Sequence, residues 1–277
     1  MKTIILAGGL GSQIGEESVR IPKPLVELGG RPIIARIMDI YSHFGHRDFI
    51  VAAGYKSLLI KQFFANYSLI ANDITVSVDS GKMTLRPVSR EEWNVSIVDT
   101  GPTNSTSGRI HRLKDWLDGE TFMVTYGDGL GNVDIDALLT FHRSHGKLAT
   151  VTAVRPHAQV GCIDIKGDRV HTFSETVQNN ETWINGGFFV FEPDALNYLM
   201  DDAEPLEKGP LPQMARDGNL MAYRHFGFWH PMDTLRDRNK LDRLAAEELP
   251  PWLEFDDTEP SPPIANDENW KSHFVSG

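Results

Sequence analysis

The chain has 277 residues, of which 40% are hydrophobic and 23% charged, the ordinary composition of a globular protein with one or two domains. Its net charge of −11 argues against a general nucleic-acid binder, which needs a basic face, but permits an anionic small substrate. The single cysteine, Cys162, excludes an internal disulfide, and no stretch has the length or the flanks of a membrane span or a signal peptide. We therefore expect a cytoplasmic protein without nucleic-acid or membrane partners.

The chain opens with an apolar run at residues 2–7 that predicts a strand, followed by glycines at positions 8, 9 and 11 and by Pro-Lys-Pro at 22–24. Glycines let a phosphate approach the backbone, whose successive N–H groups can bind an anion. Lys23 adds a charge on a segment that two prolines hold. The spacing is neither that of a dinucleotide fingerprint nor that of a P-loop. The pattern favours a nucleoside triphosphate cradle, with an ordinary strand-to-helix turn as the alternative.

Strand-like and helix-like segments then alternate, which predicts an α/β fold with a mostly parallel sheet. The first half predicts helices over 31–45, 58–67, 106–117 and 133–145, and strands over 49–53, 74–78, 95–98, 122–125 and 149–154. The second half predicts a hairpin of 161–165 with 170–173, a strand over 184–191, and helices over 195–200, 211–217 and 234–247. We expect one domain over 1–255 and a loosely ordered tail over 256–277, which is rich in Pro, Asp and Glu.

Two aspartates and one arginine are candidates for phosphate chemistry. Asp128 lies between glycines directly after a predicted strand, where open α/β sheets bind ligands. An ordinary Asp-Gly turn without a ligand would have the same sequence pattern. Asp233 precedes a predicted helix, where it could equally be an N-cap. Together the two carboxylates suit a Mg²⁺ ion that also binds phosphates and water. Arg109, near the start of a predicted helix, could direct its guanidinium at phosphate or lie on a solvated helix face.

Several segments carry a family resemblance in the same order along the chain. They are LAGGLG at 6–11, PKP at 22–24, FFANY at 63–67, YGDG at 126–129, INGGFF at 184–189 and PMDTLRD at 231–237. Over residues 1–255 the chain resembles the glucose-1-phosphate cytidylyltransferases, a branch of the sugar-nucleotide pyrophosphorylases. The segments at 63–67 and 231–237 are the more specific to the cytidylyl branch.

The resemblance implies a Rossmann-like mixed, mostly parallel sheet flanked by helices, with a smaller β-rich sugar-binding portion in the second half. It implies a homo-oligomeric, Mg²⁺-dependent enzyme that joins CTP and a sugar 1-phosphate and releases pyrophosphate. The residues it assigns are Lys23, Gln13 and Arg109 for catalysis; Leu6, Ala7, Gly8, Gly9, Gly11, Ser12, Lys23 and Gly127 for the nucleotide; Tyr126, Glu175, Thr176, Asn185 and Gly186 for the sugar phosphate; and Asp128 and Asp233 for the metal.

The chain departs from the family pattern where substrate phosphates are expected. Gln13 replaces an arginine of the glycine-rich loop, and Thr176 replaces the lysine expected to hold the sugar phosphate. A basic–aromatic pair is replaced by Gln159-Val160, and Arg155 is one nearby cation that could compensate. Two alternatives therefore stay open beside the leading one: an altered acceptor, such as a modified sugar or a cyclitol phosphate, and a non-catalytic protein that binds nucleotides or sugar nucleotides.

Overall fold

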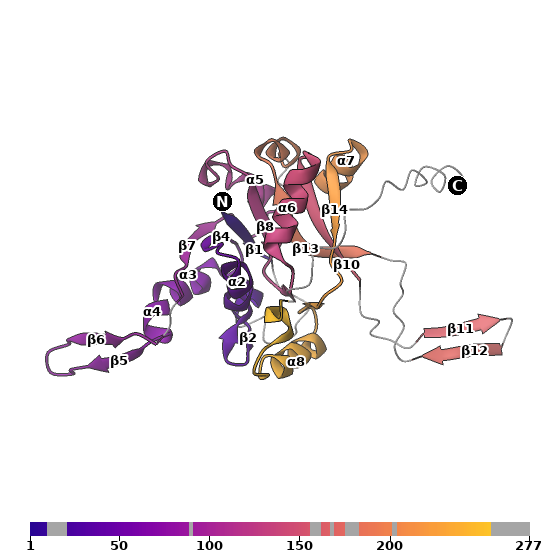
Figure 1. The fold of residues 1–277 in the computed structure, drawn as a ribbon. Helices are drawn as coiled ribbons and strands as arrows, with labels where there is room; N and C mark the ends of the chain where they lie inside the picture. Colours follow the sequence, from indigo (N-terminus) through magenta and orange to yellow (C-terminus); the bar gives the residue numbers. More distant parts are fainter. Residues whose placement is uncertain are drawn as a thin grey trace.

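A seven-stranded sheet forms the centre of the protein in the computed structural model, which describes residues 1–9, 21–88, 91–155, 162–166, 169–174, 183–200 and 204–255 (Figure 1). The strand order is β14-β10-β13-β8-β1-β4-β7. β13 pairs antiparallel with both of its neighbours, and every other pair in the sheet is parallel. The strands are β1 Thr3–Ala7, β4 Asp48–Ala53, β7 Asn94–Asp99, β8 Phe122–Tyr126, β10 Ala149–Val154, β13 Ile184–Phe191 and β14 Leu220–Arg224.

Helices cover both faces of this sheet and enclose two hydrophobic cores. Side chains alternate along β1, so that Ile5 packs into one core while Ile4 and Leu6 pack into the other. The α-helices are α2 Ile33–His43, α3 Ser57–Ala65, α4 Tyr67–Ile70, α5 Thr106–His111, α6 Ile135–His145, α7 Pro210–Arg216 and α8 Leu235–Leu244. The 3₁₀ helices are η1 Lys23–Leu25, η2 Lys114–Trp116, η3 Pro193–Tyr198 and η4 Pro251–Leu253. A strand buried on both faces explains the continuous apolar run of β1.

Four short antiparallel ribbons accompany the sheet. They pair β2 Glu27–Leu28 with β3 Arg31–Pro32, β5 Asp73–Val76 with β6 Met83–Arg86, β9 Gly129–Gly131 with β15 Trp229–Pro231, and β11 Cys162–Lys166 with β12 Arg169–Ser174. The β5–β6 ribbon projects away from the body of the molecule (Figure 1). Among the described residues, no helix combines the length and the apolar character needed to cross a bilayer.

The predicted fold class, a mixed and mostly parallel sheet flanked by helices, is confirmed. The helix predicted over 106–117 is wrong in extent: α5 ends at His111, a 3₁₀ turn follows, and the positive φ of Asp118 and Gly119 reverses the chain toward β8. The helix predicted over 195–200 is the 3₁₀ helix η3, which starts at Pro193. The sequence did not predict β2, β3, β6, β9 and β15, which are too short for a clear alternation, or β14, whose residues do not alternate between apolar and polar. The expected tail at 256–277 lies outside the described residues.

Candidate active site

A pocket of about 330 Å³ lies where β1 and β8 end. This is the edge of an open α/β sheet at which ligands bind, because the strand ends leave a crevice there. Its lining comes from the end of β1 and the loop that follows it, η1, the segment around α5, the end of β8, and Asp233, two residues before α8. The lining residues are Leu6, Ala7, Gly8, Gly9, Lys23, Pro24, Asn104, Thr106, Arg109, Tyr126, Gly127, Asp128 and Asp233.

The β9–β15 ribbon brings the two candidate metal-binding aspartates together. Gly129 pairs with Pro231 in that ribbon, and the Met232 amide donates to the Asp128 carbonyl at 2.8 Å. Asp128 and Asp233 therefore emerge side by side although they lie far apart in the sequence. The N-cap expected as an alternative role of Asp233 belongs instead to Thr234, whose hydroxyl forms a capping box with Asp237. Asp233 is thus left to face the pocket.

Lys23 joins both carboxylates through one ammonium group. Its Nζ lies 2.7 Å from an oxygen of Asp128 and 2.9 Å from an oxygen of Asp233, and the lysine side chain is only 12% exposed. Burial lowers the pKa of Lys23, but the charges and hydrogen bonds of Asp128 and Asp233 outweigh burial and raise that pKa above 10.5. The ammonium is therefore charged at neutral pH. The pocket thus contains the ammonium group of Lys23, held between Asp128 and Asp233, together with Gly8 and Gly9 of the glycine loop.

The guanidinium of Arg109 is buried at the other side of the glycine loop, where the side chain is 4% exposed. It donates to the carbonyls of Gly8 at 2.9 Å and Gly101 at 2.6 Å and to the hydroxyl of Thr100 at 2.7 Å. A Cβ on Gly8 would lie 2.1 Å from this guanidinium, and one on Gly54 would lie 2.3 Å from it. Both glycines are therefore required for arginine to enter between the ends of β1 and β4.

This contact orients the first peptide of the loop. The Gly8 carbonyl accepts from both Arg109 and the Tyr55 amide, the latter at 3.2 Å. In a trans peptide the N–H points opposite to the carbonyl, so fixing the Gly8 oxygen directs the Gly9 N–H to the opposite side of the loop. Gly9 also lines the pocket, and a Cβ placed on it would meet no atom of the described part of the chain within 4 Å. The arginine thus fixes the orientation of a backbone donor of the kind that binds anions.

Beside Asp128, one side of the pocket is backed by a hydrogen-bonded chain of side chains, which we call the wall: Tyr126, Asn185, Glu207 and Thr106. The Tyr126 hydroxyl donates to Glu207 and accepts from the Asn185 amide at 3.0 Å. Asn185 in turn accepts from the Gly187 amide at 2.8 Å, and Thr106 donates to Glu207 at 3.2 Å. Burial and the Glu207 carboxylate raise the pKa of Tyr126, so its hydroxyl stays protonated. The neutral groups of Tyr126 and Asn185, held in place by the Glu207 carboxylate, therefore lie beside the charged group of Lys23 and the two aspartates.

We expect Tyr126→Phe to disrupt the hydrogen bonds among Tyr126, Asn185 and Glu207 while leaving the glycine loop and Lys23 unchanged. Losing the hydroxyl leaves Glu207 and Asn185 without a shared partner, which should cost about 1 kcal/mol of unfolding free energy and raise the KM of the acceptor about tenfold, with kcat changed less. Tyr198→Phe is the matched control, because that hydroxyl also contacts a carboxylate and an amide, Asp217 and Asn219. An unchanged acceptor KM in Tyr126→Phe would show that the wall does not meet the substrate.

Comparison with known proteins agrees with this geometry. A family model described as nucleotidyl transferase matches residues 2–225. The chain belongs to the nucleotidyl transferase family. The glucose-1-phosphate cytidylyltransferase of Salmonella typhimurium is 45% identical over 253 residues, which cover 91% of this nucleotidyltransferase and 98% of that enzyme. The probable glucose-1-phosphate cytidylyltransferase of Bacillus subtilis is 38% identical over 245 residues, which cover 88% and 96%. The comparisons confirm the resemblance and support an enzyme over the non-catalytic alternative.

Solved structures share the fold of this nucleotidyltransferase at low sequence identity. The crystal structure of HddC from Yersinia pseudotuberculosis matches with a TM-score of 0.63 at 21% identity, covering 87% of this chain and 98% of that one. A putative glucose-1-phosphate thymidylyltransferase from Bacillus anthracis matches with a TM-score of 0.61 at 17% identity, covering 88% and 95%. These likenesses support the fold assignment.

The structure brings most residues predicted for the site into or beside one pocket. Leu6, Ala7, Gly8, Gly9, Lys23, Arg109, Tyr126, Gly127, Asp128 and Asp233 line the pocket itself. Asn185 reaches Tyr126, and the Gly186 carbonyl accepts from the Trp229 indole at 2.8 Å. Gly11, Ser12, Gln13, Glu175 and Thr176 lie outside the described residues. The chemical roles assigned to all these residues stay predictions.

Sequence reasoning missed Asn104, Thr106 and Glu207. Asn104 lies in the Thr- and Gly-rich segment before α5, and Thr106 is the first residue of that helix; this composition indicates a loop and a helix start but not a ligand contact. Glu207 follows no recognisable pattern, since its place beside Tyr126 depends on how the segment before α7 packs. Three-dimensional proximity alone identifies it.

Proposed function

We propose that this nucleotidyltransferase joins CTP and glucose 1-phosphate to give CDP-glucose and pyrophosphate. The convergence of the glycine loop, Lys23 and the Asp128–Asp233 pair in one pocket carries the proposal. An oxygen of the sugar phosphate forms a bond to the α-phosphorus of CTP, and the bond from that phosphorus to the bridging oxygen breaks. Pyrophosphate leaves with the electron pair. The 45% identical relative with this printed activity supports the choice of base and sugar.

The chain's own groups would supply positioning and charge, which is most of what such a transfer requires. The Gly9 amide, oriented through Gly8 and Arg109, would bind a phosphate oxygen. The Lys23 ammonium, already charged and buried, would neutralise the negative charge of two phosphate-bearing substrates. Tyr126 and Asn185 would hold the sugar hydroxyls, because their hydrogen-bonding groups are neutral and lie beside the charged groups.

The aspartate pair fits a Mg²⁺ ion, the cofactor we propose. Mg²⁺ takes one or two carboxylates and completes its shell with phosphates and water, and Asp128 and Asp233 offer two carboxylates that share one cation, Lys23. No group of three or more His, Cys, Asp or Glu in the described residues could hold a metal by protein ligands alone. When bound, the ion would neutralise charge on the phosphates of CTP.

Pyrophosphate release across a panel of substrates tests the proposed reaction. With glucose 1-phosphate present we expect CTP to be preferred over UTP, dTTP, ATP and GTP, and we expect a kcat/KM for CTP of about 10⁴ M⁻¹s⁻¹ or more. A purine preference would overturn the base assignment. With CTP fixed, a panel of sugar and cyclitol phosphates ranks the acceptors. Binding of CTP without turnover on any acceptor would overturn the proposed reaction as a whole.

A second candidate acceptor, a phosphate other than glucose 1-phosphate, has one supporting observation. Arg155 directly follows β10, and Arg224 is the last residue of β14, the strand that pairs parallel with β10. Their guanidinium carbons lie 4.7 Å and 5.7 Å from the centroid of the Trp183 ring. Phe226 packs edge-on against the same indole. Two arginines on an aromatic platform at the catalytic edge of the sheet suit an acceptor with an additional anionic group. A better kcat/KM for such an acceptor in the same panel would favour this alternative.

We also propose that the enzyme is a cytoplasmic homo-oligomer. The use of CTP as substrate and the single cysteine of the sequence, which needs no oxidising environment, support a location in the cytoplasm. An exposed apolar surface on the β5–β6 ribbon supports self-association.

A further inference from the structure

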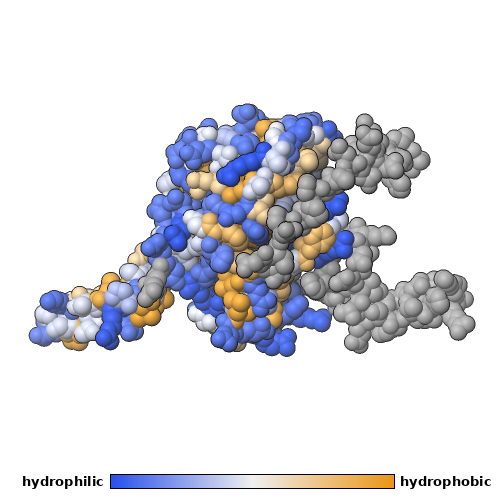
Figure 2. All heavy atoms as spheres, in the orientation of Figure 1, coloured by the Kyte–Doolittle hydropathy of each residue, from blue (hydrophilic) through white to orange (hydrophobic). Residues whose placement is uncertain are grey.

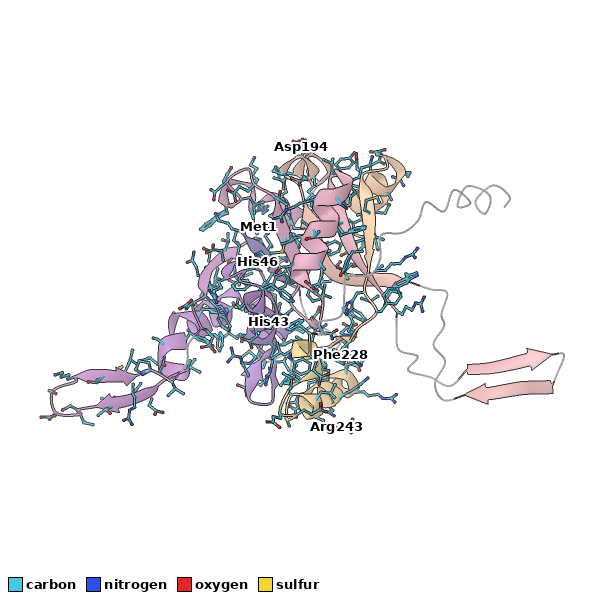
Figure 3. The ribbon with its side chains drawn as sticks, viewed as in Figure 1. Met1, His43, His46, Asp194, Phe228 and Arg243 are labelled. Carbon is cyan, nitrogen blue, oxygen red and sulfur yellow. The ribbon has the colours of Figure 1, made fainter. Side chains whose placement is uncertain are left out.

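Asp99 ends β7 at the edge of the sheet where the candidate active site lies. In the parallel pair of β4 and β7 it stands opposite Ala53, the last residue of β4. Its side chain is exposed, and it is absent from the described lining of the pocket. The surface over β7 and α3 is largely hydrophilic in Figure 2, and Figure 3 shows side chains of these two elements side by side. Asp99 therefore lies near the pocket but outside it.

The carboxylate of Asp99 contacts two neighbours through separate oxygens. Its Oδ1 accepts from the Gly101 amide at 3.0 Å, and its Oδ2 accepts from the Ser57 hydroxyl at 2.8 Å. The Gly101 amide and the Ser57 hydroxyl lower the pKa of Asp99 below its usual value, so the side chain is a carboxylate at neutral pH. One charged group thus joins the turn after β7 to the first residue of α3.

The Gly101 contact leads to the glycine loop through Arg109. Gly101 has a φ of +91°, a conformation that glycine adopts without strain. Its carbonyl accepts from the Arg109 guanidinium at 2.6 Å, and the same guanidinium donates to the Gly8 carbonyl at 2.9 Å. Because Asp99 holds the Gly101 amide, it fixes the turn that presents this carbonyl to the arginine.

The Ser57 contact leads to the same Gly8 carbonyl by a second route. Tyr55, two residues before Ser57, donates its amide to that carbonyl at 3.2 Å. Lys56 lies between them with a φ of +54°, in the left-handed region that residues other than glycine rarely adopt. Such a backbone persists only where its surroundings hold it, and the hydrogen bond from Ser57 to Asp99 is one such restraint. Asp99 therefore also supports the segment that carries the Tyr55 amide.

We propose that Asp99 is the positioning residue of the phosphate-binding loop, because both donors to the Gly8 carbonyl are tied to its carboxylate. The contacts close a ring that runs from Asp99 through Gly101, Arg109, Gly8, Tyr55 and Ser57 back to Asp99. A closed ring restrains the Gly8–Gly9 peptide more than either route alone, since each route limits the movement that the other allows. The inference rests on the proposed function, in which the Gly9 amide binds a phosphate of CTP.

Substitution of Asp99 tests this role, with calorimetric titration of CTP and of inorganic tripolyphosphate as the readout. Asp99→Ala opens the ring and should weaken the binding of both ligands about tenfold, whereas kcat at saturating CTP should change less. Asp99→Asn should restore most of the affinity, because its amide oxygen can accept from Gly101 and its NH₂ group can donate to Ser57. Asp48→Ala is the matched control and should bind as the parent does. That exposed aspartate also joins β4 to β7, through the Asn94 amide at 2.9 Å, but at the opposite ends of the two strands.

A double-mutant cycle tests the ring itself. Ser57→Ala removes one of the two contacts of Asp99 and should weaken CTP binding less than Asp99→Ala does. The double variant Ser57→Ala/Asp99→Ala should bind CTP as Asp99→Ala does, because the hydroxyl acts through the carboxylate. Losses that simply add would show that Ser57 acts independently of Asp99, and would overturn the ring.

Thermal unfolding separates positioning from stability. Because Asp99 is exposed, water can replace its contacts, so Asp99→Ala should unfold close to the parent's temperature. Equal affinity of the parent and Asp99→Ala for both ligands would overturn the inference, as would an equal loss in Asp48→Ala. Tripolyphosphate binding that depends on Asp99, in a protein that transfers nothing from CTP, would support the inference and overturn the proposed reaction.

Discussion

Asp128→Asn and Asp233→Asn are each expected to lower kcat on the order of 10³-fold at saturating CTP and metal while the protein remains folded. Each carboxylate contributes one of the two charges that surround Lys23, and asparagine keeps the shape without the charge. Because Lys23 retains its remaining aspartate in each single variant, the local fold should survive. Steady-state pyrophosphate release measures the loss, and thermal unfolding measures the fold.

The control for these substitutions is Asp115→Asn, which changes an exposed aspartate in η2 outside the pocket lining. The double variant Asp128→Asn/Asp233→Asn should have a kcat close to that of the more damaging single variant, because the effects of groups that act as one unit are not additive. Near-parental turnover in the double variant would remove the metal-binding role from both residues.

Arg109→Met should lower the free energy of unfolding by about 3–5 kcal/mol and abolish CTP binding together. Methionine fills part of the volume but leaves the carbonyls of Gly8 and Gly101 and the Thr100 hydroxyl without their donor in a buried place. The Gly8–Gly9 peptide then loses its fixed orientation. Chemical denaturation measures the stability, and calorimetric titration with CTP measures the binding.

Arg112→Met, three residues further on and exposed, is the matched control and should change neither quantity appreciably. Gly8→Ala gives an independent route to the same effect, since its Cβ would lie 2.1 Å from the guanidinium. Gly9→Ala separates the two consequences: since no atom of the described residues lies within 4 Å of its Cβ, it should leave stability nearly unchanged while blocking phosphate approach. Full stability and full CTP affinity in Arg109→Met would contradict the account of the loop.

The sequence predicted the parts of the fold that depend on local pattern. Hydrophobic periodicity alone predicts two elements that the structure contains. They are β1, from its continuous apolar run, and α2, from the helical spacing of Ile33, Ile37 and Tyr41. Pairing between distant short segments could not be read this way. The β9–β15 ribbon, which places Asp233 beside Asp128, uses three residues on each side and includes Gly129.

The site shows the same division. Lys23, Gly8 and Asp128 were recognisable because glycine, proline and a strand end mark them in the sequence. The place of Arg109 could be guessed, but its insertion between Gly8 and Gly54 joins three segments, and no local pattern encodes it. Glu207 has no signal at all, since its contact with Tyr126 arises only from packing.

The fate of a labelled α-phosphate tests the central claim most directly. The enzyme is incubated with CTP labelled at the α-phosphorus, glucose 1-phosphate and Mg²⁺, and the products are separated. The account predicts that the label moves into CDP-glucose while unlabelled pyrophosphate appears in equal amount, and that Asp128→Asn suppresses both. Label that stays in CTP, or that appears in CMP without CDP-glucose, would contradict transfer of the cytidylyl group to the sugar phosphate.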